Sequence, residues 1–291
     1  MKISFGSWAF IFGPHARTPL NLGESARRIA AAGYDGIEIS GFPPQLTLDT
    51  TAGERAEAMR ILSDLGLGVS GYAPDFTMVN PLIERNRERY LDNARKALDL
   101  CAEMGSPSIR VDTIAAPGSL PDIEYGAASR RLADLWREAA EFAAERKVHI
   151  VWEFEPGFVF NKPSEVVEIY ERVGHPSFQI LFDLSHAYMC GVAGARQQGE
   201  VETLAGGVGG FLELLSGRIG HLHVVDSDGT LYGEETSTHC PFGEGLIAFD
   251  QLGPKLRGIP GLAWWCVDLS FRSDQDRVLR SSLEFVRKLS S

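Results

Sequence analysis

The chain has 291 residues, a formal net charge of −11 and 44% hydrophobic residues, which is ordinary for a globular protein with a sizeable core. No stretch approaches the roughly 18 uninterrupted apolar residues that a membrane span needs. No run of Lys and Arg offers a basic face to a phosphate backbone. We therefore expect neither a membrane nor a nucleic acid as partner. The start of the chain shows no signal-peptide pattern, so we expect a cytoplasmic protein. Its four well-separated cysteines predict reduced thiols: Cys101, Cys190, Cys240 and Cys266.

Short β-rich runs alternate with longer helical segments along the chain. The expected strands are residues 3–8, 36–40, 68–72, 108–112, 149–154, 179–183, 220–225 and 262–269. The expected helices are residues 22–32, 51–65, 81–104, 125–146, 163–173, 201–216, 249–257 and 274–289. Several strands are nearly continuous apolar runs, which is typical of parallel strands covered on both faces.

Eight strands, each followed by a helix, predict an α/β fold of the (β/α)8 TIM-barrel type. A doubly wound sheet is the alternative, but residues 6–9 (GSWA) lack the GxGxxG turn of that fold. Because no linker or low-complexity tract interrupts the pattern, we expect one domain over residues 1–291.

Barrel active sites lie at the carboxyl ends of the strands, so polar residues at those ends are the candidates. The fifth strand ends in Glu153 and Glu155, which alternation places on one face. A buried carboxylate needs a partner, either a metal or a neighbouring Arg. The sixth strand ends in Asp183, followed by His186. Asp183 is either a metal ligand or the cap of the next helix, with His186 then a solvated loop residue.

The seventh and eighth strands contribute two further candidates. His221 and His223 form an HxH pair, which predicts two imidazoles on one face converging on a metal. Asp268 is the one charge in an apolar strand, where burial without a cation would raise its pKa. Four successive strands thus each deliver one acid or imidazole at the same height.

This conjunction predicts one divalent metal ion bound by Glu153, Asp183, His223 and Asp268. Three carboxylates and one nitrogen suit Mn²⁺, Co²⁺ or Mg²⁺, with Fe²⁺ and Zn²⁺ as alternatives.

The motifs around these residues resemble the xylose isomerase-like TIM-barrel superfamily. Its members include ketose 3-epimerases, inosose dehydratases, hydroxypyruvate isomerases and endonuclease IV-type repair enzymes. The resemblance spans nearly the whole chain and rests on residues 31–38 (AAGYDGIE), 153–157 (EFEPG), 182–187 (FDLSHA), 221–226 (HLHVVD) and 239–245 (HCPFGEG). Two positions depart from the family pattern: Val225 replaces the usual Lys, and Asp268 replaces the usual Glu.

The resemblance implies that Glu153 and Asp268 also act as an acid/base pair on the two faces of a sugar. Proton abstraction beside a carbonyl would give an enediolate that the metal stabilises. The leading hypothesis is thus an isomerase or epimerase of a sugar or sugar derivative. The alternatives are an inosose dehydratase-like lyase, an endonuclease IV-type phosphodiesterase and a catalytically silent barrel. Ser237, where the repair enzymes carry Asp, argues against the phosphodiesterase.

A small sugar-like substrate is the expected partner, and the resemblance implies a homodimer or homotetramer. Three of the candidates have alternative explanations: ordinary loop packing for Trp8, a simple pair with Asp112 for Arg110, and an open role for Glu155. Glu38 we expect to be a hydrogen-bonding group inside the barrel. The candidate substrate-binding residues are Trp8, Arg110, Glu155, His186 and His239.

Overall fold

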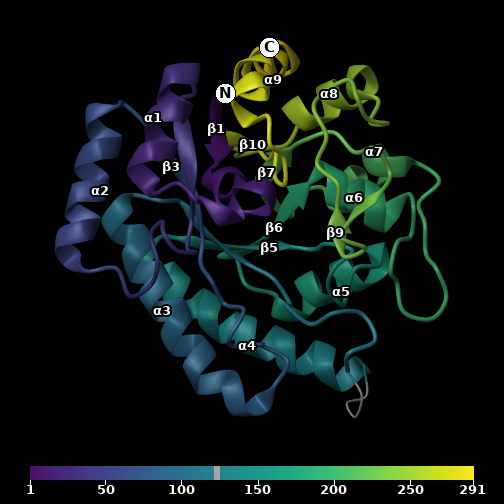
Figure 1. The fold of residues 1–291 in the computed structure, drawn as a ribbon. Helices are drawn as coiled ribbons and strands as arrows, with labels where there is room; N and C mark the ends of the chain where they lie inside the picture. The colour runs from purple at the N-terminus through teal and green to yellow at the C-terminus, as the bar shows by residue number, and fades with distance from the viewer. Residues whose placement is uncertain (121–124) are drawn as a thin grey trace.

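The computed structural model describes residues 1–120 and 125–291, and eight parallel strands close into a barrel at its centre (Figure 1). Around the barrel the strands follow the order β1-β10-β7-β6-β5-β4-β3-β2. The predicted (β/α)8 fold is confirmed. The strands are β1 (Lys2–Gly6), β2 (Gly36–Ser40), β3 (Gly68–Ala73), β4 (Ser108–Val111), β5 (His149–Glu153), β6 (Phe178–Asp183), β7 (Ile219–Val224) and β10 (Trp264–Val267).

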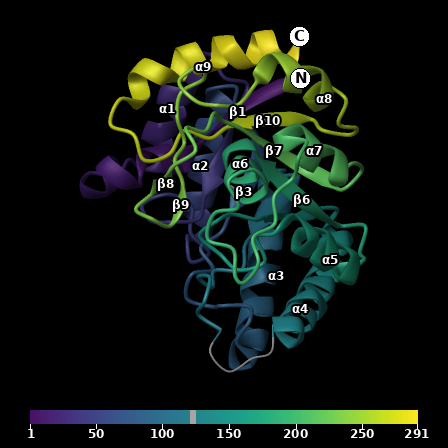
Figure 2. The same ribbon diagram turned by 90° about the vertical axis from the view of Figure 1, so that its right-hand side faces the viewer.

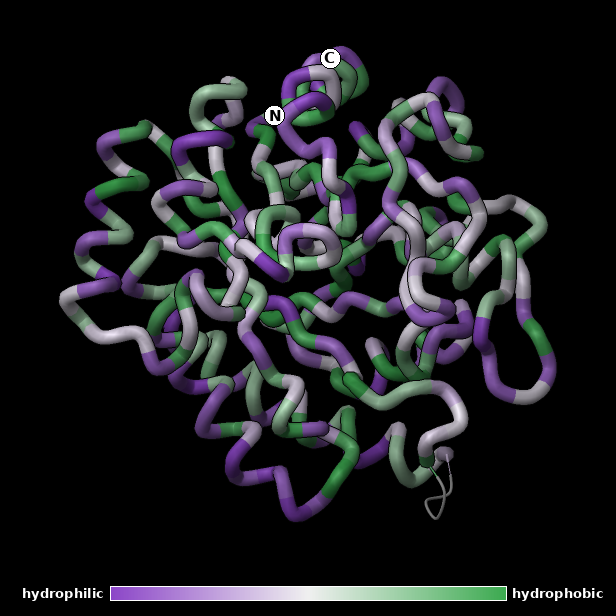
Figure 3. Tube along the Cα trace, viewed as in Figure 1, coloured by the Kyte–Doolittle hydropathy of each residue, from purple (hydrophilic) through white to green (hydrophobic). Residues whose placement is uncertain are grey.

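Helices surround this barrel in both views (Figures 1 and 2). Hydrophobic and hydrophilic residues alternate along the outer helices in Figure 3, as expected of helices with one face on a barrel. Within the described residues no helix is long and apolar enough to cross a membrane. The α-helices are α1 (Leu22–Ala32), α2 (Ala52–Asp64), α3 (Arg87–Met104), α4 (Tyr125–Arg146), α5 (Pro163–Val173), α6 (Leu184–Gly191), α7 (Gly207–Leu214), α8 (Phe249–Arg257) and α9 (Gln275–Ser290). The 3-10 helices are η1 (Ser7–Phe10), η2 (Gly13–Arg17) and η3 (Glu84–Asn86).

Side-chain caps set several of the helix starts. Asn21 and Thr51 each accept a hydrogen bond from the backbone N–H three residues on, and the Glu there bonds back to the cap. These reciprocal capping boxes satisfy N–H groups that have no partner within the helix. The predicted helix 51–65 accordingly begins one residue later, after its cap.

Other predicted boundaries were wrong. The first strand ends at Gly6 rather than at Trp8, which lies in η1. The predicted helix 81–104 begins at Arg87, because the Asn80 side chain accepts from the Leu82 N–H and closes a turn there. The predicted helix 201–216 shortens to α7, whose first residues are glycine-rich. The predicted strand 262–269 shortens to β10.

One helix and one hairpin near the site were not predicted. Helix α6 follows β6 directly, and the short strands β8 (Leu231–Tyr232) and β9 (Thr236–Ser237) form an antiparallel hairpin. The hairpin contacts the loops at the carboxyl ends of the strands, because Thr236 bonds to Glu155 and the Tyr232 ring stacks on Phe271.

Candidate metal centre

Strands β5, β6, β7 and β10 bring Glu153, Asp183, His223 and Asp268 together at one end of the barrel. One ligand atom from each lies within 4.8 Å of all the others. His223 Nδ1 is at the centre, 2.9 Å from Glu153 Oε1, 3.5 Å from Asp268 Oδ2 and 3.7 Å from Asp183 Oδ2. All four side chains are buried. The structure therefore places the four predicted ligands around one point, and the shorter Asp268 reaches it too.

Three of these atoms make no hydrogen bond of normal geometry among the described residues: Glu153 Oε1, Asp183 Oδ2 and His223 Nδ1, although the first and the last lie 2.9 Å apart. Leaving buried polar atoms unpaired costs several kcal/mol, so natural proteins rarely do so without a compensating ligand. Three carboxylates and one imidazole nitrogen are also a donor set that divalent cations accept. The residues present thus fit a metal ion.

Asp183 caps helix α6 with one carboxylate oxygen and leaves the other free to bind a metal. Its Oδ1 accepts the backbone N–H of His186 at 2.8 Å and caps α6, while Oδ2 faces the centre. His186 is buried rather than solvated. Its Nδ1 lies 2.8 Å from Ser237 Oγ and its Nε2 lies 3.7 Å from Glu155 Oε2.

Arg110 on β4 holds the second oxygen of Glu153. Its Nη1 lies 2.8 Å from Glu153 Oε2, and its Nη2 donates to Asp112 at 3.2 Å. Burial raises the pKa of Glu153, but the Arg110 charge and the contact with His223 outweigh it and lower the pKa to about 2. Burial raises the pKa of Asp112 to about 6, since nearby carboxylates oppose the effect of Arg110. Glu153 is therefore a stable carboxylate.

Asp268 is held through its Oδ1 atom. The Trp8 indole N–H donates to it at 2.8 Å, the Ser270 hydroxyl at 2.7 Å, and His239 Nδ1 lies 3.2 Å away. Burial raises the pKa of Asp268, but His239, His223 and Trp8 together hold it well below the usual range. Burial lowers the pKa of His239, but Asp268 and the other acids raise it to about 9. The carboxylates of the centre thus stabilise a positive charge placed among them, such as that of a protonated His239.

The prediction that both histidines of the HxH pair converge on a metal was wrong for His221. Both Nε2 atoms instead meet Glu38 Oε2, at 2.6 Å from His221 and 3.1 Å from His223. Two residues along a strand span about 7 Å, which sets His221 one layer deeper in the barrel. Glu38 is the hydrogen-bonding group inside the barrel that the sequence predicts.

A cavity of about 140 Å³ opens beside the metal centre. Aromatic rings contribute to its lining, from Trp8, Phe12, Phe42 and Phe271. Charged and imidazole groups line it as well: Arg110, Glu153, Glu155, His186, His239 and Asp268. All five predicted substrate-binding residues therefore line one cavity. Larger cavities lie elsewhere on the molecule, such as one of about 300 Å³ between α6, α7 and α8. They are not lined by Glu153, Asp183, His223 or Asp268.

Several residues that line this cavity were not predicted from the sequence. Phe42, Phe271, Ser270 and Thr236 lie in loops or in the hairpin, and their order along the chain carries no periodic signal. Phe271 has φ +62°, a left-handed conformation that a Phe rarely adopts, and nothing in the sequence marks it.

Asp226 fixes the loop that carries His239. Its carboxylate accepts the backbone N–H groups of Gly243 and Gly245 at 3.0 and 3.1 Å, and also those of Ser227 and Ile247. A Cβ at Gly245 would lie 2.2 Å from Asp226 Oδ1, so only glycine fits there. The Asp of the seventh-strand motif therefore organises the loop and does not enter the metal centre.

Known proteins resemble this chain in sequence and in fold. The chain is similar to fructoselysine 3-epimerase of Shigella flexneri, 25% identical over 284 residues that cover 94% of this chain and 95% of that protein. A stretch of 166 residues is 27% identical to 3-dehydroshikimate dehydratase of Pseudomonas putida and covers 57% of this chain and 24% of that protein. The crystal structure of a D-tagatose 3-epimerase-like protein has a TM-score of 0.77 at 21% identity, covering 99% of this chain and 97% of that chain. The family described as Xylose isomerase-like TIM barrel matches residues 26–289. The protein therefore belongs to the xylose isomerase-like TIM-barrel family, as its motifs predict.

Proposed function

We propose that this protein is a metal-dependent epimerase or isomerase of a sugar or sugar derivative. The observation that carries the proposal is the buried convergence of three carboxylates and one imidazole, three of whose facing atoms make no hydrogen bond of normal geometry within residues 1–120 and 125–291. Similarity to a fructoselysine 3-epimerase along 94% of the chain supports this reaction class.

Glu153, Asp183, His223 and Asp268 would hold the divalent metal, for which Mn²⁺, Co²⁺ and Mg²⁺ are our candidates and Fe²⁺ and Zn²⁺ the alternatives. When bound, such an ion polarises the carbonyl and neighbouring hydroxyl oxygens of a sugar. A cytoplasmic location and a homodimeric or homotetrameric assembly remain predictions.

The proton chemistry falls to Glu153 and Asp268 in this proposal. Glu153, a carboxylate with a pKa of about 2, takes the proton from the carbon beside the carbonyl. The C–H electron pair moves into the new C–C double bond while the carbonyl π pair moves onto the carbonyl oxygen. Asp268, also a carboxylate at rest, takes a proton from His239 and delivers it to that carbon on the opposite face. The double-bond pair forms the new C–H bond and an oxygen pair restores the carbonyl, so the configuration is inverted. His239 Nδ1, 3.2 Å from Asp268, can exchange a proton with this carboxylate.

The remaining cavity residues bind and orient the sugar. Trp8 and Phe42 offer apolar faces to the C–H side of a sugar ring. Glu155, His186 and Arg110 offer hydrogen bonds to its hydroxyls from the polar side.

Incubation of the purified, metal-loaded protein with fructoselysine and D-tagatose in deuterated water tests the proposal. An epimerase yields an inverted product with deuterium at one carbon beside the carbonyl, detected by NMR. A product that has lost water would instead identify a dehydratase, the second candidate, which the partial similarity to 3-dehydroshikimate dehydratase supports. Absence of exchange with every sugar and metal tested would contradict both functions.

A further inference from the structure

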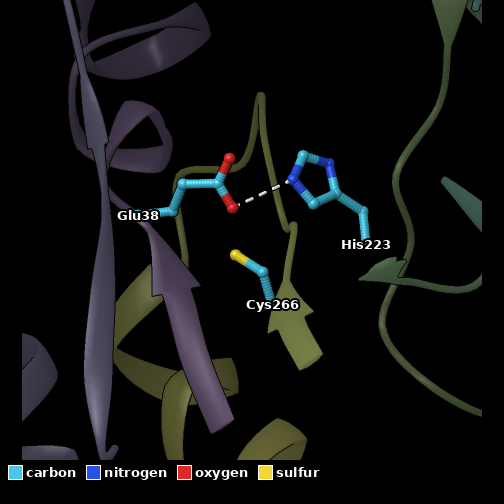
Figure 4. A group of neighbouring side chains, drawn as sticks. All are labelled: Glu38, His223 and Cys266. Atoms are coloured by element: carbon cyan, nitrogen blue, oxygen red, sulfur yellow. Dashed lines mark hydrogen bonds and ion pairs between the residues drawn. The ribbon is translucent and has the colours of Figure 1, made fainter. Parts of the chain in front are cut away.

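A second layer of polar side chains lies directly under the metal centre, formed by Glu38, His221 and Cys266. All three are buried, with 1%, 3% and 0% of their surfaces exposed. Figure 4 shows the Glu38 carboxylate facing the His223 ring, with the Cys266 sulfur beneath them and no bond drawn to it. The layer touches the metal centre through His223, which faces Glu38 with Nε2 and the three carboxylates with Nδ1.

We propose that Glu38 is a positioning residue that fixes the tautomer of His223, keeping a proton on Nε2 so that Nδ1 presents its lone pair to the metal. This inference rests on the proposed metal site. An ionised carboxylate can only accept hydrogen bonds, so the nitrogen 3.1 Å from Glu38 Oε2 must be a donor. Only a neutral imidazole can bind a metal, and because its single N–H is then the one on Nε2, Nδ1 is left as the ligand atom. Metal-binding histidines commonly donate their other N–H to such a carboxylate.

The backbone around Glu38 holds its carboxylate at this place. The pairing of β2 with β3 shifts register between Ile37 and Glu38, a local irregularity of the kind that re-aims a side chain. Gly71 lies against Glu38, and a Cβ there would be only 3.1 Å from the carboxyl carbon. His221 Nε2 binds the same oxygen at 2.6 Å from below. Backbone, neighbour and second histidine thus all restrict where the carboxylate lies.

Glu38, His223 and Cys266 do not need a second metal to explain their proximity. Glu38 Oε2 already accepts from two imidazoles, and His223 Nε2 is one of those donors, so no lone pair of that nitrogen is free. The structure therefore assigns Glu38 to orienting His223.

The variants Glu38→Met and Glu38→Gln test this role, since Met removes the acceptor at similar length and Gln keeps an acceptor without the charge. We expect Glu38→Met to weaken metal binding by about 10- to 100-fold, measured by chelator competition, and Glu38→Gln to recover part of the loss. In ¹⁵N-histidine-labelled, metal-free wild type, NMR should show a one-bond N–H signal at Nε2 of His223, protected from solvent exchange. Cys266→Ser is the matched control from the same layer and should change neither readout.

The proposal is overturned if His223 of the metal-free wild type carries its proton on Nδ1 alone, or if folded Glu38→Met binds metal as tightly as wild type. The NMR readout does not depend on metal. A protected Nε2–H in a wild type that binds no divalent ion would therefore contradict the proposed function and leave the positioning by Glu38 intact.

Discussion

Strands β5, β6 and β7 and the residue directly after β10 carry the four side chains of the candidate metal centre, whereas η1 and strands β2 and β4 carry groups that hold them. The sequence already shows the imbalance, because acids and histidines gather at strand ends in the second half of the chain. The structure shows what the first half contributes instead. Trp8 donates to Asp268, Arg110 pairs with Glu153, and Glu38 accepts from His223.

The two halves of the barrel therefore contribute different groups: the second half carries the converging side chains, and the first half carries partners that hold three of them. Each of these three ligands uses one atom toward the centre and another toward its partner from the first half. Asp183 is the exception, since its second oxygen caps α6 within its own half. Fixing side chains on both sides reduces the reorganisation needed when charge develops during reaction.

Removing a ligand from the second half should have the largest effect. We expect Glu153→Gln to lower kcat by about 10²- to 10⁴-fold, because the general base is lost. Steady-state kinetics with the sugar identified as substrate measure this. Glu155→Gln is the matched control, since Glu155 lies two residues on but outside the four-residue group, and its loss should be clearly smaller. Equal losses in the two variants would contradict the assignment.

Removing a partner from the first half should act mainly on stability. Arg110→Met leaves Glu153 and Asp112 buried without their cation, which should cost about 3 kcal/mol of unfolding free energy, the low end for a broken buried pair. The low end applies because a quarter of the Arg110 side chain is exposed. Urea unfolding measures the change. A variant as stable as wild type would show that the Arg110 pair does not hold Glu153.

The fold and the four residues that converge at the end of the barrel could be predicted because their signals are local. Apolar runs ending in a single acid or imidazole mark buried strands with a functional end, as in Ile180–Asp183 and in β10 followed by Asp268. The partners could not be predicted, since they arise from closure of the barrel. Glu38 and His221 lie 183 residues apart, and the Trp8–Asp268 bond joins residues 260 apart. The sequence pattern does not predict which strands pair in the barrel or how deep in the barrel each side chain lies.

The charge balance of the metal centre predicts a pH dependence in the metal-free protein. The pKa of His239 is about 9 in the folded state and near 6.5 when unfolded, so protonation stabilises the fold. This contribution is fully present below pH 6.5 and is lost as the pH rises through 9, by at most about 3 kcal/mol. The raised pKa of His223 adds in the same direction.

Urea unfolding of the metal-free protein at pH 6.5 and at pH 9.5 would measure that loss. The variant His239→Gln should show a shallower decline than wild type, while retaining the part due to His223. A decline of the same size in both proteins would contradict the role given to His239.

The smallest effect is expected for Trp8→Phe, which keeps an aromatic ring beside the cavity and removes one N–H. Loss of the 2.8 Å bond to Asp268 should cost about 1.5 kcal/mol, or roughly a tenfold fall in kcat/KM. Trp265→Phe is the control, because its indole N–H is buried without a partner among the described residues. If both substitutions lowered kcat/KM alike, the Trp8 bond would not position Asp268.

Metal binding by Asp183→Asn tests the central claim most directly, since Asn keeps an oxygen to cap α6 and replaces only the oxygen that faces the centre. We expect wild type to bind one divalent ion per chain by calorimetry and elemental analysis, and the folded variant to bind it at least tenfold more weakly. A wild type without metal, or a variant with wild-type affinity, would contradict a metal centre formed by these four residues.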